Sequence, residues 1–279
     1  MEVFPAVDPI PLPAPVWLFM ALHTLTLILH FIALHFLIGG LLLAPAWGLA
    51  GRWSKDTSLR QVSQLIARRL PVVMTYVINL GVPPLLFTQV LYGRALYTSS
   101  ILIGAWWISV IGLLLFGYSM LYVMVQRGET GRTFVLAGGA ALLSVLMIAM
   151  IYSTNMTLML RPERWPGIYR ANPFGATFHT GDPTMFPRWL FMMLGSAGIG
   201  GVGLLLLSLK QDLTHDVQRF LRQWGGRLTV IFIALQVAAA VWVVQVQTAP
   251  VMDALAGVLF YRFCEGGWLV SAALLIILG

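Results

Sequence analysis

The sequence predicts an all-α protein, a polytopic bundle of transmembrane helices, from three observations. Of its 279 residues, 59% are hydrophobic and only 10% are charged, and the mean hydropathy is +0.85. A soluble domain of this length carries about 25% charged residues. Six apolar runs are long enough for helices that cross a bilayer, each of which takes about 20 residues. The formal charges lie outside these runs. We therefore expect six full spans and a partial or short seventh.

The six full spans are expected at residues 16–51, 70–92, 98–125, 134–155, 189–209 and 228–246. The second contains Pro71, Gly81, Pro83 and Pro84, and proline removes a backbone donor in mid-helix. We expect that span to be kinked or unwound. In the fifth, the small-residue pairs Ser196/Gly200 and Ala197/Gly201 allow a close helix neighbour.

Three other segments complete the expected organisation. Residues 1–15 form an extended, Pro-rich leader, and residues 16–279 form one transmembrane domain with a structured segment at 157–187. Residues 248–267 predict a short amphipathic helix on the membrane surface. The remaining apolar run is too short to cross alone, so the seventh helix either stops part-way or begins nearer Phe260.

The charges predict which side of the membrane each loop occupies. Loops at 52–69, 127–132 and 210–227 hold 11 of the 17 Lys and Arg residues but only 4 of the 10 Asp and Glu residues. Cytoplasmic loops carry an excess of Lys and Arg. We therefore expect the N-terminus and the 157–187 segment on the outer side of a bacterial inner membrane. The basic balance follows this topology and does not indicate nucleic acid.

Three of the five histidines lie in the first span, where polar groups usually face a partner, a cavity or a cofactor. At 100° per residue His23 and His30 share a face, about 10 Å apart along the axis, while His35 points about 140° away from His30. These imidazoles are expected either to ligate a haem or to hydrogen-bond to another helix, a lipid or a quinone.

A haem in a bundle usually has a second His or Met from another helix. Because every histidine within a span is on one helix, two histidines cannot clamp a haem between helices of this chain. His–Met ligation is the remaining pairing. The candidate sulfur ligands are Met147, Met150, Met156, Met192 and Met193, each of which is otherwise expected to fill space in the core.

The order and local pattern of the spans resemble the N-terminal part of subunit I of cytochrome bd quinol oxidase, over residues 17–247. The resemblance is carried by HFIALHFLIGGLLLA from His30, by VINLGVPPLLFTQVLYGRALYTSSILIGAWWISVIGLLLF, and by NPFGATF at Asn172–Phe178. In that family a first-helix histidine ligates a b-type haem. The resemblance thus implies that His30, with His23 beside it, binds haem iron or faces a quinone.

The departures from that family concern its oxygen chemistry. Near the start of the fifth span, where the family has another haem-ligating histidine, this chain reads WLFMML, so only Met192 or Met193 could substitute. The family's third-helix carboxylates and its long quinol-binding loop have no counterpart. The resemblance therefore implies a relative that kept the scaffold and does not reduce oxygen by itself, and we nominate no catalytic residue.

The expected function is that of a multi-pass membrane subunit in a bacterial respiratory electron-transfer complex, passing electrons between the quinone pool and an extrinsic periplasmic cytochrome. The c-type haems would belong to that partner, because this chain has no CxxCH motif. Other membrane subunits are expected beside it. Two alternatives remain: a cofactor-free anchor for a periplasmic multihaem c-type cytochrome, and a solute transporter built on the Pro-interrupted second span.

The topology has a direct test. A cysteine at Thr177, in a Cys264→Ser background, should react with an impermeant maleimide added to the periplasmic side, because the charge distribution places residues 157–187 there. Labelling of intact spheroplasts measures this. Reaction only after the membrane is opened would reverse the assigned orientation.

Overall fold

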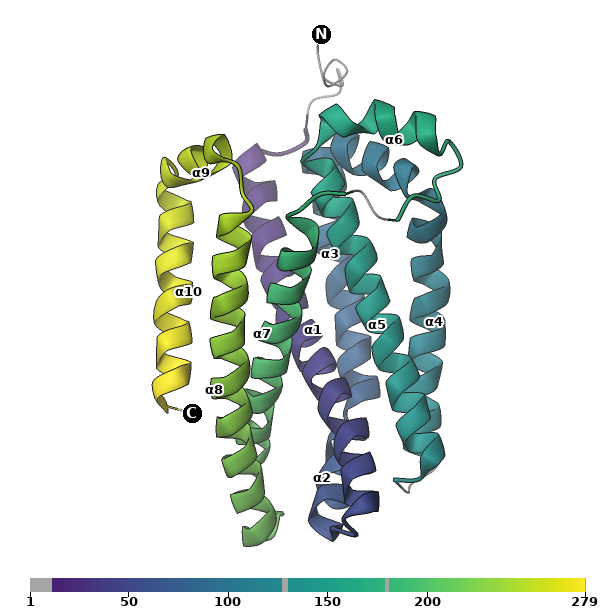
Figure 1. Ribbon diagram of the computed structural model, residues 1–279, viewed down its shortest axis with the longest axis vertical. Coiled ribbons are helices and arrows are strands. Elements are labelled where there is room, and N and C mark those ends of the chain that lie inside the picture. Colours follow the sequence, from purple (N-terminus) through teal and green to yellow (C-terminus); the bar gives the residue numbers. More distant parts are fainter. Residues whose placement is uncertain (1–11, 127–129, 179–180, 279) are drawn as a thin grey trace.

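The computed structural model is an all-α bundle of long, roughly parallel helices (Figure 1), and it describes residues 12–126, 130–178 and 181–278. The elements are α1 (Val16–Trp53), α2 (Thr57–Ala67), α3 (Leu70–Leu102), α4 (Gly104–Gln126), α5 (Arg132–Met159), η1 (Pro162–Arg164), α6 (Trp165–Ala171), α7 (Met185–Leu207), α8 (His215–Gln245), α9 (Ala249–Ala256) and α10 (Leu259–Leu278). Among the described residues, seven helices are long and apolar enough to cross a membrane. This confirms a multi-pass membrane protein.

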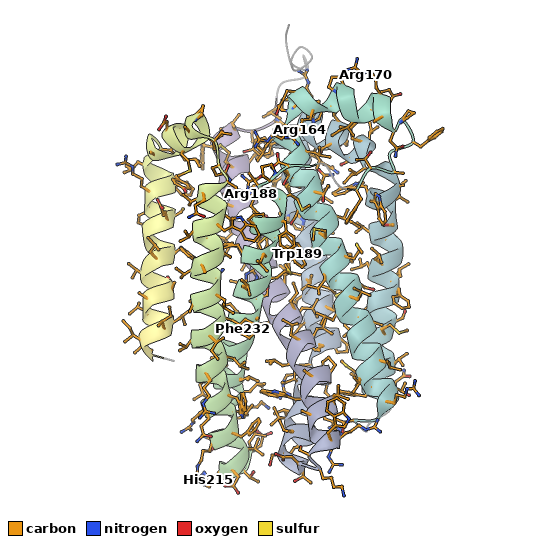
Figure 2. The ribbon with its side chains drawn as sticks, in the orientation of Figure 1. Arg164, Arg170, Arg188, Trp189, His215 and Phe232 are labelled. Atoms are coloured by element: carbon orange, nitrogen blue, oxygen red, sulfur yellow. The ribbon has the colours of Figure 1, made fainter. Side chains whose placement is uncertain are left out.

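The two ends of the bundle differ in what covers them. At the α6 end, α6 and α9 lie across the helix ends, and at the α2 end, α2 packs beneath α1 (Figure 1). Figure 2 shows Arg164 and Arg170 at the α6 end and His215 at the α2 end. The predicted leader at residues 1–15 lies largely outside the described residues.

Several predicted boundaries change in the structure. The second span stays helical through Pro83 and Pro84, and the one non-helical residue inside α3 is Tyr92. Beyond Tyr92 the chain remains helical to Leu102, so the third span begins at Gly104 and not near residue 98. Of the two expected alternatives, the span is kinked and not unwound, and the kink lies at Tyr92 and not at the prolines. Neighbouring helices, to which the α3 backbone also bonds, support a proline-containing helix in a membrane.

The C-terminal region also differs from the expectation. The predicted surface helix at 248–267 is confined to α9, and α10 begins at Leu259, in agreement with the expected alternative of a seventh helix that begins near Phe260. The predicted basic loop at 210–227 is helical from His215 onward, so α8 extends beyond the predicted span 228–246 at the α2 end. A span of 20 residues such as α10 reaches about 30 Å.

α1 is the central helix, packing against α2, α3, α5 and α7. Its contact with α7 is backbone on backbone: an added Cβ at Gly39 would lie 2.5 Å from the Cα of Gly200 and 2.7 Å from the carbonyl oxygen of Ser196. One turn of α7 therefore touches α1 without side chains between them. The predicted Ser196/Gly200 pair is confirmed as a close-contact face.

The opposite side of α7 is equally close to α8. An added Cβ at Gly201 would lie 2.7 Å from the carbonyl oxygen of Gly225 and 2.6 Å from Oγ1 of Thr229. Thr229 donates from that hydroxyl to the Gly225 carbonyl at 2.8 Å. The small residues thus let α7 serve as a thin central layer between α1 and α8, which accounts for both predicted pairs.

Adding one methyl group should show how much this contact stabilises the fold. Gly200→Ala places a Cβ 2.8 Å from Cα of Gly39, and forced overpacking costs about 1–3 kcal/mol. We expect a lower thermal unfolding midpoint in detergent, measured by size exclusion after heating. The matched control is Gly112→Ala, at a position with nothing within 4 Å. Equal midpoints for the two variants would contradict a tight α1–α7 contact.

Candidate functional site

Two imidazoles join α1 to α3. Nδ1 of His23 is 3.2 Å from the carbonyl oxygen of Pro84, and Nδ1 of His30 is 3.1 Å from that of Val77. The histidines are seven residues apart and so are the carbonyls, in the reverse order, because the two helices are antiparallel. Each pair is about 10 Å apart along its helix. The predicted shared face of His23 and His30 is thus directed at α3.

These contacts determine the protonation of each neutral ring. A carbonyl oxygen only accepts, so Nδ1 must carry the proton and donate it. Nε2 then carries a lone pair, and within the described residues Nε2 of His30 makes no hydrogen bond. A metal-ligating histidine usually donates its other ring N–H to a carboxylate, a carbonyl or water. His23 and His30 therefore have the hydrogen-bonding arrangement of potential ligands or acceptors.

Gly81 makes room for His30 against α3. An added Cβ at Gly81 would lie 2.9 Å from Cε1 and 3.0 Å from Nδ1 of His30. Any larger residue would force the imidazole away from the Val77 carbonyl. Gly81 suggested an interrupted helix, but α3 is helical there, and Gly81 is the place where the imidazole of His30 packs onto it.

His35 faces a different neighbour. On an ideal helix it lies about 40° from Gly39, which touches α7, whereas His30 lies about 180° from Gly39. The side chain of Phe31 packs between the two imidazoles, with ring centroids 5.9 Å from His30 and 5.8 Å from His35. Nδ1 of His35 is buried, and the nearby Phe31 carbonyl lies outside hydrogen-bonding geometry.

Two of the five candidate sulfur ligands, Met192 and Met193, lie on α7, and the other three, Met147, Met150 and Met156, lie on α5. Met193 is buried in the main apolar core, and Met192 is half-buried beside it. Because His30 projects from the side of α1 opposite to α7, the structure does not bring His30 together with Met192 or Met193. His35 is the imidazole on the α7 side. The angle between His30 and His35 followed from the sequence, but the helix that each of these two faces of α1 contacts did not.

The α1–α3 face could offer a haem iron one imidazole nitrogen. The described residues contain no group of three or more His, Cys, Asp or Glu side chains that could hold a metal ion. His23 and His30 are too far apart to share an iron, since metal–nitrogen bonds are about 2 Å long. One nitrogen, Nε2 of His30, remains the predicted protein ligand.

A polar cluster at the α6 end was not predicted. Asn155 of α5 is fully buried and joins two serines of α3: Ser99 donates to its Oδ1 at 2.7 Å, and its Nδ2 donates to Ser100 at 2.9 Å. A buried amide with both ends bonded specifies how two helices meet. The sequence signal for this cluster was Asn155 itself, a polar residue at the end of the otherwise apolar span 134–155.

A second unpredicted feature fastens the 157–187 segment. Asp182, whose side chain is 1% exposed, accepts from Nε of Arg161 at 2.7 Å and from the backbone N and Oγ1 of Thr184 at 2.8 and 2.6 Å. Burial alone would raise the pKa of Asp182, but the hydrogen bonds from Thr184 and Arg161 and the charge of Arg161 hold it below its ordinary value of 3.8. Arg161 is thus engaged within the chain.

The same segment is also bonded to α4. Trp106 donates from Nε1 to the Ala176 carbonyl at 3.0 Å, and its ring lies 4.7 Å from that of Phe178. Gly175 has φ +66°, and an added Cβ there would lie 2.7 Å from the Ile101 carbonyl. Only glycine suits this turn. The NPFG stretch is thus a tight cover over the junction of α3 and α4.

Comparisons with protein families, with curated proteins and with solved structures found no match to this chain.

The Asp182 contacts predict an acid-sensitive outer segment. Asp182→Asn should lower stability at neutral pH by about 1.5–3 kcal/mol, because hydrogen bonds to a charged group are lost. A carboxyl with a depressed folded-state pKa stabilises the fold above its unfolded pKa of about 3.9, and this contribution is lost as the pH falls through the folded pKa. Thermal unfolding between pH 7 and pH 3 should therefore show the gap between wild type and variant closing only in acid.

The control for this measurement is Asp212→Asn. Asp212 pairs with Lys210 at 3.7 Å, and both side chains are exposed, so its loss should cost less than about 1 kcal/mol. A gap between wild type and Asp182→Asn that persists unchanged at pH 3 would show that charge at Asp182 is not the cause.

Proposed function

We propose that this chain is a membrane subunit of a bacterial respiratory electron-transfer complex, passing electrons between the quinone pool and an extrinsic cytochrome. The observation that carries the proposal is the fixed position of the His30 ring together with its unbonded Nε2 atom. Its ring is fixed between α1 and α3 by a carbonyl and by Gly81, and its Nε2 lone pair has no hydrogen bond within the described chain. The resemblance to subunit I of cytochrome bd quinol oxidase supports the same residue.

In this proposal a bound b-type haem would supply one-electron transfer. His30 would hold the iron through Nε2, while the Val77 carbonyl fixes the imidazole tautomer and its orientation. Gly81 sets how closely the ring approaches α3. The Nε2 atom of His23, about 10 Å nearer the α6 end, has the same lone pair and can accept a hydrogen bond from a quinol hydroxyl.

A cofactor-free anchor for a periplasmic multihaem cytochrome is the second candidate, and a specific observation favours it. His23 and His30 both donate hydrogen bonds to α3 and so already have a structural role. Hydrogen bonding to another helix was one of the alternatives that we expected from the sequence. The 157–187 segment is fastened to the bundle by Asp182 and Trp106 and presents a fixed surface. Such a surface is suited to holding a partner in one orientation.

Optical spectra of the purified chain separate the two functions. If His30 is a haem ligand, a reduced-minus-oxidised spectrum should show a b-type signal that His30→Ala removes. His23→Ala is the matched control, because it breaks an equivalent hydrogen bond to α3 seven residues away, and it should leave most of the signal. His35→Ala should also leave the signal nearly intact, since that ring projects toward α7.

Folding must be checked in the same samples, because His30→Ala also removes a bond between helices. His30→Gln provides a side chain that can still donate to the Val77 carbonyl while offering only a poor ligand to iron, so it should fold and lack the signal. Folded wild type with no b-type band would disprove haem ligation and leave the anchor as the function of the chain.

A further inference from the structure

The flank of α8 at the α2 end has a hollow of about 410 Å³ that none of the preceding functions uses. It is lined by Arg222, Gln223, Arg227, Val230 and Ile231. All five residues belong to α8, and its basic and apolar residues lie in consecutive turns.

The lining changes character at the expected border of the bilayer. Val230 and Ile231 belong to the apolar run that starts at Leu228, whereas Arg222 and Arg227 precede it. Arg222 lies about 7.5 Å further along the axis than Arg227, at the depth of lipid headgroups. Both arginines are exposed, and no acidic residue lines the hollow.

Arg227 is also held in place. Its guanidinium lies 5.8 Å from the ring centroid of Trp224, within the range of a cation–π interaction. Trp224 in turn packs against Trp47, at 6.2 Å between ring centroids, and against Phe220, also at 6.2 Å. The cation is thus positioned by an aromatic cluster, so less side-chain freedom is lost when it binds an anion.

We propose that this hollow binds one anionic phospholipid of the leaflet at the α2 end. Arg222 and Arg227 leave α8 about 140° apart, but both long side chains line the hollow. Each guanidinium can therefore donate two parallel hydrogen bonds to a phosphate bound there. Gln223 bonds to the polar headgroup, and one acyl chain follows Val230 and Ile231. Adjacent basic and apolar surfaces fit an amphiphile with a negative headgroup, whereas a soluble anion leaves the apolar part unused. This site is independent of any haem or quinone.

Native mass spectrometry of the detergent-purified chain tests the proposal with phosphatidylglycerol and phosphatidylcholine as probes. Wild type should bind one phosphatidylglycerol in preference to phosphatidylcholine. Each interfacial Arg contributes about fivefold to anionic-lipid affinity, so the double variant Arg222→Gln/Arg227→Gln should lose about thirtyfold. Arg222→Gln alone should lose about fivefold.

Two controls isolate the hollow from general surface charge. Arg219→Gln removes an exposed cation of the same helix outside the lining and should preserve the preference. Arg222→Lys/Arg227→Lys keeps the charge but removes the paired guanidinium donors, so its preference for phosphatidylglycerol should lie between those of wild type and the double Gln variant.

The proposal is overturned if wild type binds both lipids equally, if the double Gln variant keeps the full preference, or if Arg219→Gln loses as much as Arg222→Gln. Inorganic phosphate at the same concentration should not displace the lipid, and displacement would show a free-anion site in place of a lipid site.

Discussion

The side-chain-free contact between Gly39 and Gly200 is the constraint on which the rest of the bundle depends. It sets the distance between α1, which touches most other long helices, and α7, which separates α1 from α8. In lipid there is little hydrophobic drive for helices to associate, so close packing and hydrogen bonds must supply the attraction. Backbone atoms in contact maximise the dispersion energy. The same small residues on two sides of α7 bring three helices together.

Around this contact, three polar side chains bond neighbouring helices to each other. Asn155 joins α5 to α3, and His23 and His30 join α1 to α3. Because unsatisfied polar groups are costly in hydrocarbon, each of these partners restricts how its helices can be arranged. The buried Nδ1 of His35 is the exception on α1, and it faces α7, away from the other two rings.

Much of the fold could be predicted from the sequence, because span length, charge position and small-residue spacing act through local physics. The apolar runs located the membrane helices, and the pairs Ser196/Gly200 and Ala197/Gly201 located the close contacts of α7. Helical geometry also placed His23 and His30 on one face. The prolines were misjudged, since whether Pro83 and Pro84 interrupt a helix depends on the neighbours that support it. Pairings such as Arg161 with Asp182, 21 residues apart through a turn-rich segment, could not be foreseen.

The repeated seven-residue spacing of the α1–α3 bonds affects the axial position of α3 relative to α1. If α3 slid past α1 by one turn, both imidazoles would lose their carbonyls together, and the ring of His30 would no longer be opposite Gly81 but opposite a residue with a side chain. A single bond would tolerate some rocking about its own position. Two bonds about 10 Å apart can both form at only one axial offset of α3 relative to α1. During insertion, this pair can therefore select the correct axial position of the second long helix before the later helices have entered the membrane.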